Sequence, residues 1–394
     1  MHLKKMKNVA IAALLLTPMM ILRAQASEKK LIEFGWDKAT PIQVYNNVQG
    51  RMQKYPFDGI VMYLPGNARN VFDITKWDEE KPQLLDQLRI LRLIKWGKLT
   101  DNFISMNVKS SMDWFSDSDW EKVLSKVMFL AQAGKAGRCK GLVLDPEAYG
   151  FSPWVYEKQK NANTISYDDY AAKVFQRGRQ FMNAMQKDWP GFKLLVTSQY
   201  IGFYHPQQAE QTDAPKPNHN LYKTFLNGML DAADPGVQMV DCNEAAYYYT
   251  DPIQYFKAYW TIRQGARNFA VPPELREKYD THIRAGSALF IDQVFGTRKM
   301  DANFVRIHGK EKAYAAPRMT PDKRARWCEQ NAYYALQTSD EYVWVYSQQM
   351  NWWWNRDIPP GALDAITSAK NKVAANKDLG FDMDAVFDRV QANQ

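Results

Sequence analysis

Short apolar runs recur along this chain, and each closes on polar or aromatic residues. Most are followed by a stretch whose apolar residues repeat at the spacing of a helix. Buried strands that alternate with helices are typical of a parallel sheet covered on its outer side, and eight such units close a β/α barrel. The runs are LIEFGWD (31–37), DGIVMYL (58–64), DNFISMNVK (101–109), CKGLVLDPEAYG (139–150), FKLLVTSQYIGF (192–203), VQMVDCNEAAYYY (237–249), SALFIDQVFG (287–296) and EYVWVYSQQMNWWW (341–354). The sequence therefore predicts an α/β fold, a (β/α)8 TIM barrel.

The segments after the third and fourth runs keep a helical period. The first is expected to begin near Asp117 and Ser118, and the second to stop at Trp189-Pro190-Gly191. An open doubly wound sheet is the alternative, but no glycine-rich phosphate turn follows the first run. The apolar positions are Trp120, Val123, Leu124, Val127, Met128 and Ala131 in the first helix, and Tyr170, Val174, Phe175, Phe181, Met182 and Met185 in the second.

The length of the chain allows for long connections around one barrel. Its 394 residues exceed what a bare barrel needs, and no linker or low-complexity tract divides them. We therefore expect one barrel domain over residues 27–394. The segments expected to leave strands are long (148–166, 203–220 and 297–319), which places them over the carboxyl ends of the strands, where barrels carry their sites.

The first 26 residues have the pattern of a secretory signal peptide. Three lysines precede the apolar run Val9–Leu22, and small residues surround a cleavage site before Ser27. The sequence therefore predicts residues 1–26 as a leader and a secreted or periplasmic protein, with an uncleaved anchor as the alternative. No later run approaches the ~20 apolar residues of a membrane helix, so no stable span is expected after cleavage.

The charge and the cysteines narrow the range of partners. Removal of the leader lowers the formal net charge from +8 to +4, and no Lys/Arg block remains that would follow a nucleic-acid backbone. Cys139, Cys242 and Cys328 form no CxxC pair and the five histidines form no HExxH spacing, so neither a metal nor another cofactor is expected. The cysteines are expected to be buried, and the oligomeric state stays open.

Asp145 and Glu147 are the sharpest chemical signal in the chain. They follow the strand Gly141–Leu144 at a spacing of two, which points both side chains toward the same side of a strand. Because one carboxylate raises the pKa of a neighbouring carboxyl, such a pair suits a general acid near neutral pH. A solvated or helix-capping acid pair is the alternative.

The D-x-E at the end of the fourth run resembles the chitinase-type signature of the barrel glycoside hydrolases. That resemblance implies that Glu147 protonates the glycosidic oxygen and that Asp145 positions an acetamido group of the substrate. The last run, with Trp344, is similar to the final strand of many such enzymes, in which a tryptophan forms the floor of the subsite. Lys140 and Val143 stand where the upstream part of the signature has acidic residues.

If the sugar does not assist, a second carboxylate must act as nucleophile or base. Asp241 and Glu244, at the end of the sixth run, are the catalytic candidates, although Glu244 has the alternative role of capping the next helix. Asp292 is a weaker candidate and is assigned to substrate binding.

Aromatic and polar side chains near the strand ends indicate the substrate class. Sugar rings stack their C–H faces on aromatic rings while their hydroxyls bond to amides and carboxylates. About half of the aromatic rings are expected to pack in the core instead, but Trp344 is expected at the mouth rather than inside the barrel. The predicted substrate-binding residues are Trp36, Tyr149, Gln199, Tyr200, Asn243, Asp292, Trp344, Tyr346, Gln348 and Trp353.

Together these features predict an exported glycoside hydrolase that cleaves a polysaccharide or oligosaccharide by carboxylate general acid/base catalysis. We expect it to cut at internal bonds of the polysaccharide. A non-catalytic carbohydrate-binding barrel is one alternative, because Gln348 stands where a carboxylate would serve and an amide exchanges no proton. A polysaccharide lyase is the other, with a Tyr or Lys, such as Lys109, as the base.

Overall fold

The computed structural model describes residues 28–37, 39–148, 150–203, 220–297 and 316–383. The predicted leader, Tyr149 and most of the predicted loops 203–220 and 297–319 lie outside the described residues.

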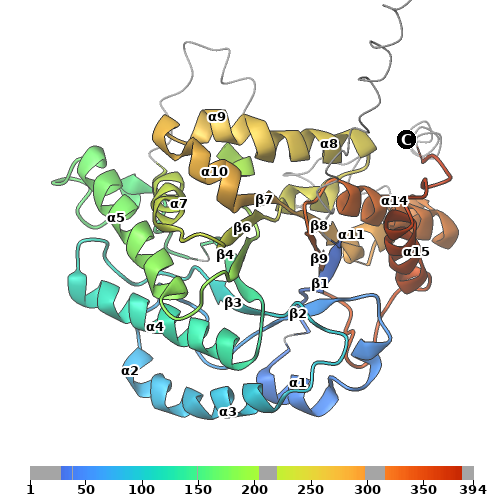
Figure 1. Cartoon of the computed structure of the whole chain (residues 1–394), viewed down its shortest axis with the longest axis horizontal. Coiled ribbons are helices and arrows are strands. Elements are labelled where there is room, and N and C mark those ends of the chain that lie inside the picture. The colour runs from blue at the N-terminus through green and yellow to red at the C-terminus, as the bar shows by residue number, and fades with distance from the viewer. Residues whose placement is uncertain (1–27, 38, 149, 204–219, 298–315, 384–394) are drawn as a thin grey trace, which may run out of the picture.

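The described residues form one sheet of nine strands, all of whose pairings are parallel. The spatial order is β7-β6-β5-β4-β3-β2-β1-β9-β8, so neighbours in sequence are mostly neighbours in space. Figure 1 looks down the ring that these strands make. The strands are β1 (Lys30–Glu33), β2 (Gly59–Met62), β3 (Phe103–Asn107), β4 (Gly141–Asp145), β5 (Lys193–Val196), β6 (Gln238–Asp241), β7 (Ile283–Ala285), β8 (Ser287–Phe290) and β9 (Tyr342–Tyr346).

The ring closes through one segment that pairs with both of its neighbours. β7 pairs with β6, β8 pairs with β9, and only Gly286 separates β7 from β8. The Gly286 amide donates to the Asp241 carbonyl at 2.8 Å, so the break in pairing falls on a single residue. Residues 283–290 therefore act as one strand in two halves, and the nine strands correspond to the eight of the predicted barrel.

This closing strand begins earlier and ends sooner than the sequence predicts. The predicted run 287–296 misses β7, because Arg284 interrupts the apolar pattern that marks a buried strand. The second half of the run is not a strand, since Ile291–Phe295 forms the helix α11. A short apolar run cannot be assigned to strand or helix by its periodicity alone.

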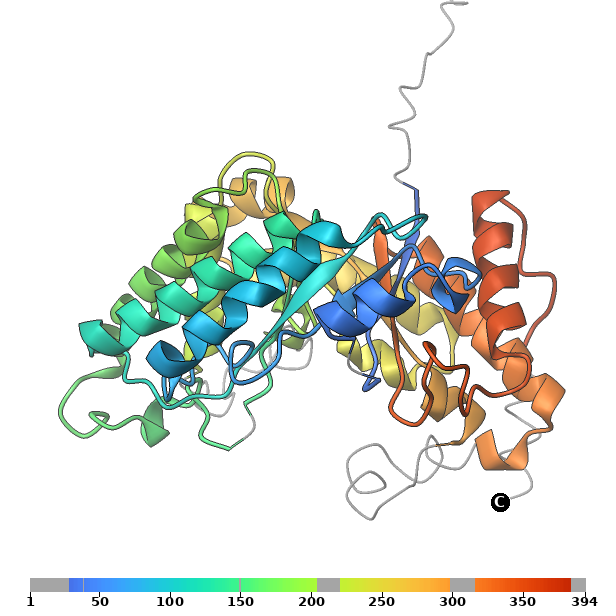
Figure 2. The ribbon, with the colours of Figure 1, turned by 90° about the horizontal axis from the view of Figure 1, so that it is seen from below.

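Helices surround the ring, and those after β3 and β4 confirm the helical periods seen in the sequence. Ser116 and Ser166 cap α4 and α5, each accepting a hydrogen bond from the third residue on. Figure 2 shows α3, α4 and α5 side by side on the outside of the sheet. The described helices are α1 (Pro41–Asn47), α2 (Trp77–Glu80), α3 (Leu85–Leu93), α4 (Asp117–Ala136), α5 (Tyr167–Gln186), α7 (Leu221–Ala232), α8 (Pro252–Trp260), α9 (Ala266–Ala270), α10 (Arg276–His282), α11 (Ile291–Phe295), α14 (Pro321–Gln337) and α15 (Ala362–Ala374).

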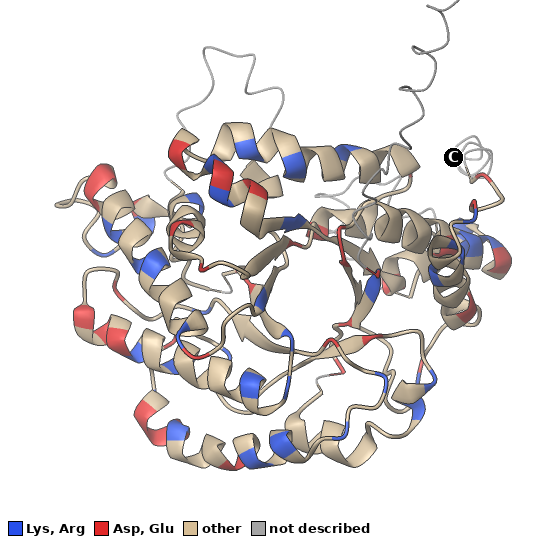
Figure 3. Ribbon diagram, in the orientation of Figure 1, with Lys and Arg blue, Asp and Glu red and all other residues tan. Residues whose placement is uncertain are grey.

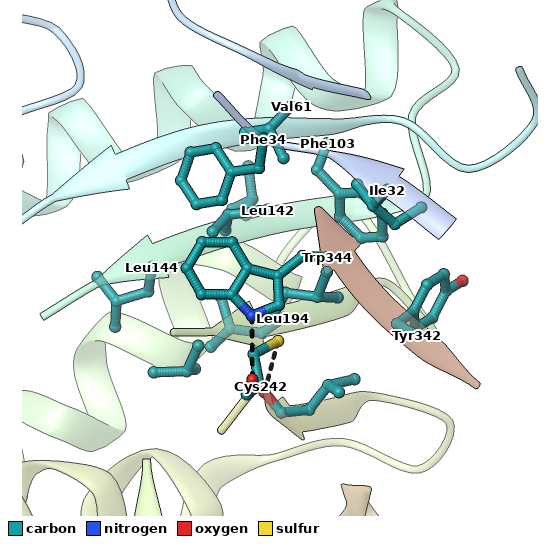
Figure 4. Packing of buried hydrophobic residues seen from close by; sticks show 14 of the residues in the cluster. Ile32, Phe34, Val61, Phe103, Leu142, Leu144, Leu194, Cys242, Tyr342 and Trp344 are labelled. Carbon is teal, nitrogen blue, oxygen red and sulfur yellow. Dashed lines mark hydrogen bonds between the residues drawn. The ribbon is translucent and has the colours of Figure 1, made fainter. Parts of the chain in front are cut away.

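The interior of the ring is filled by side chains, as in other small barrels. Figure 4 shows the indole of Trp344 in its centre, among Phe34, Leu142, Leu194 and Cys242. All five residues are less than 9% exposed. The barrel is therefore a packed core, and any site must lie above it.

The outer surface carries charges of both signs over its helices (Figure 3). Within the described residues, no helix is long and apolar enough to cross a membrane. Cys139, Cys242 and Cys328 are buried and unpaired, as the sequence predicts.

Gly286→Ala is expected to destabilise the protein by about 1 to 3 kcal/mol, the usual cost of overpacking a core. A Cβ atom there would lie 2.9 Å from Val240 Cγ1 and 3.2 Å from the carbonyl oxygens of Asp241 and Tyr342. Urea unfolding measures the change. Gly202→Ala is the matched control, because its Cβ would meet only Ser198 Oγ, at 3.5 Å. An equal effect of the two substitutions would contradict a special role for Gly286.

Candidate active site

A cavity of about 440 Å³ opens at the carboxyl ends of the strands. Residues that end β3, β4 and β9 meet there with residues that follow β1, β2, β5 and β6. Its lining is Phe34, Trp36, Tyr63, Arg69, Asn70, Asn107, Val108, Lys109, Asp145, Glu147, Thr197, Glu244, Tyr247, Trp344 and Tyr346. Three carboxyl groups, two cations and six aromatic rings thus share one pocket.

Asp145 is the last residue of β4 and is fixed by two hydrogen bonds. Its Oδ1 accepts from the Glu147 amide at 3.1 Å, and its Oδ2 accepts from Asn107 Nδ2 at 2.9 Å. Asn107 stands beside it in register at the end of β3. Burial and the negative charge of Glu147 together raise the pKa of Asp145 to about 7.

Glu147 and Glu244 complete the group of acids. Glu147 lies beyond the end of β4, where its side chain is exposed in the pocket. Glu244 follows β6, and its amide donates to the Thr197 carbonyl at 3.0 Å, which ties it to the end of β5. Burial raises the pKa of Glu244 to about 8, with added contributions from the charges of Glu147 and Asp145. Glu244 also begins a short 3₁₀ helix, Glu244–Tyr248, so it stands at a helix start as well as in the pocket.

Asp241, the other predicted catalytic residue of the sixth run, does not line this pocket. It is fully buried at the end of β6 and accepts backbone hydrogen bonds from Gln199, Ile201 and Asn243, at 3.4, 2.8 and 3.3 Å. Burial raises its pKa to about 6. The Asp241 carboxylate therefore joins the segments that follow β5 and β6 through their backbone amides.

Asp292 and Gln348 likewise lie outside the pocket lining. Asp292 is fully buried and accepts from the backbone amides of Gln348 and Gln349, at 2.7 and 3.3 Å, and from Thr297 Oγ1 at 2.8 Å. Gln348 donates its side-chain amide to the Tyr346 hydroxyl at 2.9 Å. It therefore contacts a residue of the pocket without lining the pocket itself.

The aromatic residues divide between the rim and the floor. Trp36 is 57% exposed at the rim, where a sugar ring has access to its face. Tyr346 stacks on Tyr247, with ring centroids 5.1 Å apart. Trp344 is only 3% exposed, and its indole N–H donates to the Cys242 carbonyl at 3.0 Å. Trp344 differs from the expectation of a ring held outside the barrel, because it fills the interior and forms the pocket floor (Figure 4).

Four other predicted binding residues are buried away from the pocket lining, and Tyr149 lies outside the described residues. Tyr200 donates to Asn227 Oδ1 at 3.1 Å, and Asn243 accepts from the Tyr249 hydroxyl at 3.3 Å. Gln199 and Trp353 are 1% and 3% exposed. Strand-end position alone did not separate these residues from those that face the cavity.

Several polar residues that line the pocket were not among the site residues predicted from the sequence. Arg69 and Asn70 lie in the segment after β2, which has no recognisable motif. Asn107 ends β3, and its position at the end of a predicted strand is the sequence feature from which it could have been predicted. Thr197 follows β5 in the same way.

A second pair of acids lies close to the first strand. Glu33, on β1, is 1% exposed, and Asp37 accepts from the Trp352 amide at 3.3 Å. Burial raises the pKa of both carboxyls, that of Asp37 to about 6, and Asp37 raises that of Glu33 further. Across the described residues, no group of three or more His, Cys, Asp or Glu side chains is arranged to hold a metal ion.

No family model matches the chain, and no curated protein matches it in sequence. Similar solved structures include a GH18 chitinase from Pseudoalteromonas aurantia, 11% identical, covering 86% of this chain and 100% of that chain, with a TM-score of 0.37. PbGH5A, a glycoside hydrolase family 5 enzyme from Prevotella bryantii B14, is 10% identical over 88% and 97%, with a TM-score of 0.41. A sugar phosphate isomerase/epimerase from Parabacteroides distasonis is 12% identical over 88% and 98%, with a TM-score of 0.36. Because barrels host many chemistries, the function must be argued from the site itself.

Trp344→Ala is expected to lower the free energy of unfolding by about 3 to 5 kcal/mol, the usual cost of removing a buried tryptophan. The residue fills the barrel interior and donates a buried hydrogen bond. Urea unfolding measures the loss, and Trp36→Ala is the control, since Trp36 is exposed. Equal stability of the two variants would contradict a packing role for Trp344.

Glu33→Gln is expected to flatten the dependence of stability on pH. An acid whose pKa is higher in the folded state holds more protons there, so the stability of the wild type falls as pH rises from the ordinary carboxyl range past the raised values. The variant lacks one titrating group, so its stability relative to the wild type in urea unfolding should rise as the pH increases from about 4. A constant difference as the pH rises would contradict the buried acid pair.

Proposed function

We propose that this protein is a glycoside hydrolase that works by carboxylate acid/base catalysis. The observation that carries the proposal is the meeting of Asp145, Glu147 and Glu244 in one pocket at the carboxyl ends of the strands. Glycoside hydrolysis needs a proton donor and a second carboxylate on either side of the scissile bond. Aromatic rings in the same pocket supply faces for sugar stacking.

Glu244 is the proposed proton donor. Its pKa of about 8 keeps it protonated at neutral pH, as a general acid must be. This assignment differs from the resemblance to chitinases, which gives the proton to Glu147. Glu147, exposed in the cavity, takes the role of nucleophile or base, and Asp145, whose two oxygens are held by Asn107 and the Glu147 amide, positions the segment that carries Glu147.

A polysaccharide substrate, cut inside the chain, is proposed on the distribution of exposed rings. Trp36 at the rim is 57% exposed, and Phe151, which follows β4, is 44% exposed. Exposed aromatic residues in the segments that follow β1 and β4 supply faces on which further sugar rings can stack.

A polysaccharide lyase is the second candidate, because Lys109 and Tyr63 line the same pocket. A lyase base must take a proton from the carbon next to a uronate. Burial raises the pKa of Tyr63 well above its ordinary value, which opposes that role for the tyrosine. A carbohydrate-binding barrel without catalysis would need neither reaction.

We also propose that the protein is exported, on the order of the charged, apolar and small residues in positions 1–26. The mass of the mature protein tests this. Recovery of a soluble mature species that retains Met1 would contradict it.

Glu244→Gln and Glu147→Gln are each expected to lower turnover by about 10² to 10⁴, the usual contribution of a general acid or base. The assay follows new reducing ends on a panel of polysaccharides, together with the absorbance of unsaturated ends. Wild-type activity should also fall as pH rises past about 8, where Glu244 loses its proton. Glu121→Gln, an exposed glutamate on α4, is the matched control.

The three candidates give different results in this assay. Reducing ends without unsaturated ends support a hydrolase, whereas unsaturated ends indicate a lyase. Binding without either product indicates a carbohydrate-binding barrel. Full activity of both glutamine variants would exclude these carboxyls from the reaction.

A further inference from the structure

We propose that the pocket binds a sugar that carries a negative group, a uronate carboxylate or a sulfate ester, and that Arg69 is its principal contact, with Lys109 beside it. The inference rests on the proposed function in that a sugar occupies the cavity. The further point is that this sugar is negatively charged, which the proposed catalytic carboxyls do not determine. It is supported by the fixed position and free donors of Arg69 in the segment after β2, and by the other charged groups that line the pocket.

The backbone holds Arg69 at the edge of the sheet. Its carbonyl accepts from the Asn107 amide at 2.7 Å, and the Val71 amide donates to the Asn107 carbonyl at 3.1 Å. Asn70 thereby forms a parallel bridge with Asn107, the last residue of β3. The segment is an extension of the sheet, so Arg69 has a fixed place in the wall of the pocket.

A buried lysine fixes the same segment from the helix side. Lys126, on α4, is 0% exposed, and its Nζ donates to the carbonyls of Asn70 and Asp73, at 2.8 and 2.5 Å. Its Nζ also lies 5.5 Å from the centre of the Trp77 ring. Burying an ammonium group is costly unless its donors are satisfied, and here they are used to hold the loop that bears Arg69.

The guanidinium of Arg69 makes no hydrogen bond or ion pair with any of the described residues. It lies over the ring of Tyr63, 5.1 Å from the centroid, and lines the cavity. The charge of Arg69 lowers the pKa of Asp145, but no hydrogen bond or ion pair joins these two side chains. A guanidinium has five donors in a planar fork that fits a carboxylate or sulfate oxygen pair. The donors are thus available to a ligand.

Lys109 supplies a second positive charge in the same wall. Its Nζ is 3.3 Å from Asp73 Oδ2, and its side chain is 57% exposed. Asp73 is buried, so this pair holds the lysine side chain in the wall, while an ammonium group has three donors and needs only one of them for Asp73. The remaining donors are therefore available to an anion in the cavity, which Lys109 also lines.

The acids of the pocket do not prevent an anionic ligand from entering. Burial raises the pKa of Asp145 to about 7 and that of Glu244 to about 8, so near neutral pH part of the acid charge is absent. Guanidinium groups, by contrast, carry a positive charge at every physiological pH. Near neutral pH the balance in the pocket favours a negative group next to Arg69.

The test compares matched charged and neutral oligosaccharides by calorimetry, with the products checked for cleavage. Oligogalacturonate is paired with its methyl ester, and sulfated carrageenan oligosaccharides with neutral agaro-oligosaccharides. Wild-type protein should prefer the charged member of at least one pair by about tenfold or more, in keeping with a hydrogen bond to a charged group. Rising salt should reduce the preference. The pair that shows it identifies carboxylate or sulfate as the group.

Arg69→Gln should abolish the preference while leaving affinity for the neutral probe within about twofold, since only the charge-assisted bonds are lost. Arg69→Lys should retain part of it, because the charge stays but the fork does not. Arg89→Gln, an exposed arginine on α3, is the matched control and should change nothing.

Each result decides the matter. A preference that survives Arg69→Gln, no preference in either pair, or no binding of any probe would overturn the inference. If the protein hydrolyses a neutral glycan and Arg69→Gln leaves that activity unchanged, the inference is also overturned. The proposed function would then still hold. Conversely, charge-selective binding without any cleavage would support the anion contact and reject the hydrolase.

Discussion

The architecture depends on one strand, which pairs with β6 on one side and with β9 on the other and so closes the sheet into a ring. β7 and β8 are halves of that strand, and Gly286 between them donates to the Asp241 carbonyl. Because all pairings are parallel, closing the ring brings the carboxyl ends of all strands to one mouth. Residues far apart in sequence, such as Tyr247 after β6 and Tyr346 on β9, meet there because the sheet closes.

Much of the fold followed from the sequence because a parallel barrel leaves strong patterns. Buried strands read as apolar runs, and the faces of α4 and α5 repeat at the helical period. β7 was missed because it has three residues and Arg284 in its middle. α11 was read as strand because its residues continue the apolar run Ser287–Phe290 without a break and are too few to show a helical period.

The residues of the cavity could be predicted where an acidic side chain lies at, or just after, the end of a strand. Asp145, Glu147 and Glu244 reach the cavity, whereas Asp241 and Asp292 stand at equivalent points but turn to backbone amides. The sequence does not encode that choice locally, since it depends on the direction of the neighbouring loops. Arg69 escaped notice for a related reason, because its place is set by Lys126 and Asn107, which are distant in sequence.

The strand register at the mouth fixes the distance between Arg69, the proposed contact for a charged group, and the proposed catalytic carboxyls. Asn107 pairs with Asn70 on one side and with Asp145 on the other. Two strand spacings, about 10 Å, therefore separate the backbone that carries the guanidinium from the end of β4, which carries Asp145. A ligand that engages both must present its charged substituent and its reactive bond at different points along its length. On the proposed roles, a change in the loop after β2 would alter which substituent is accepted without moving the proposed catalytic carboxyls.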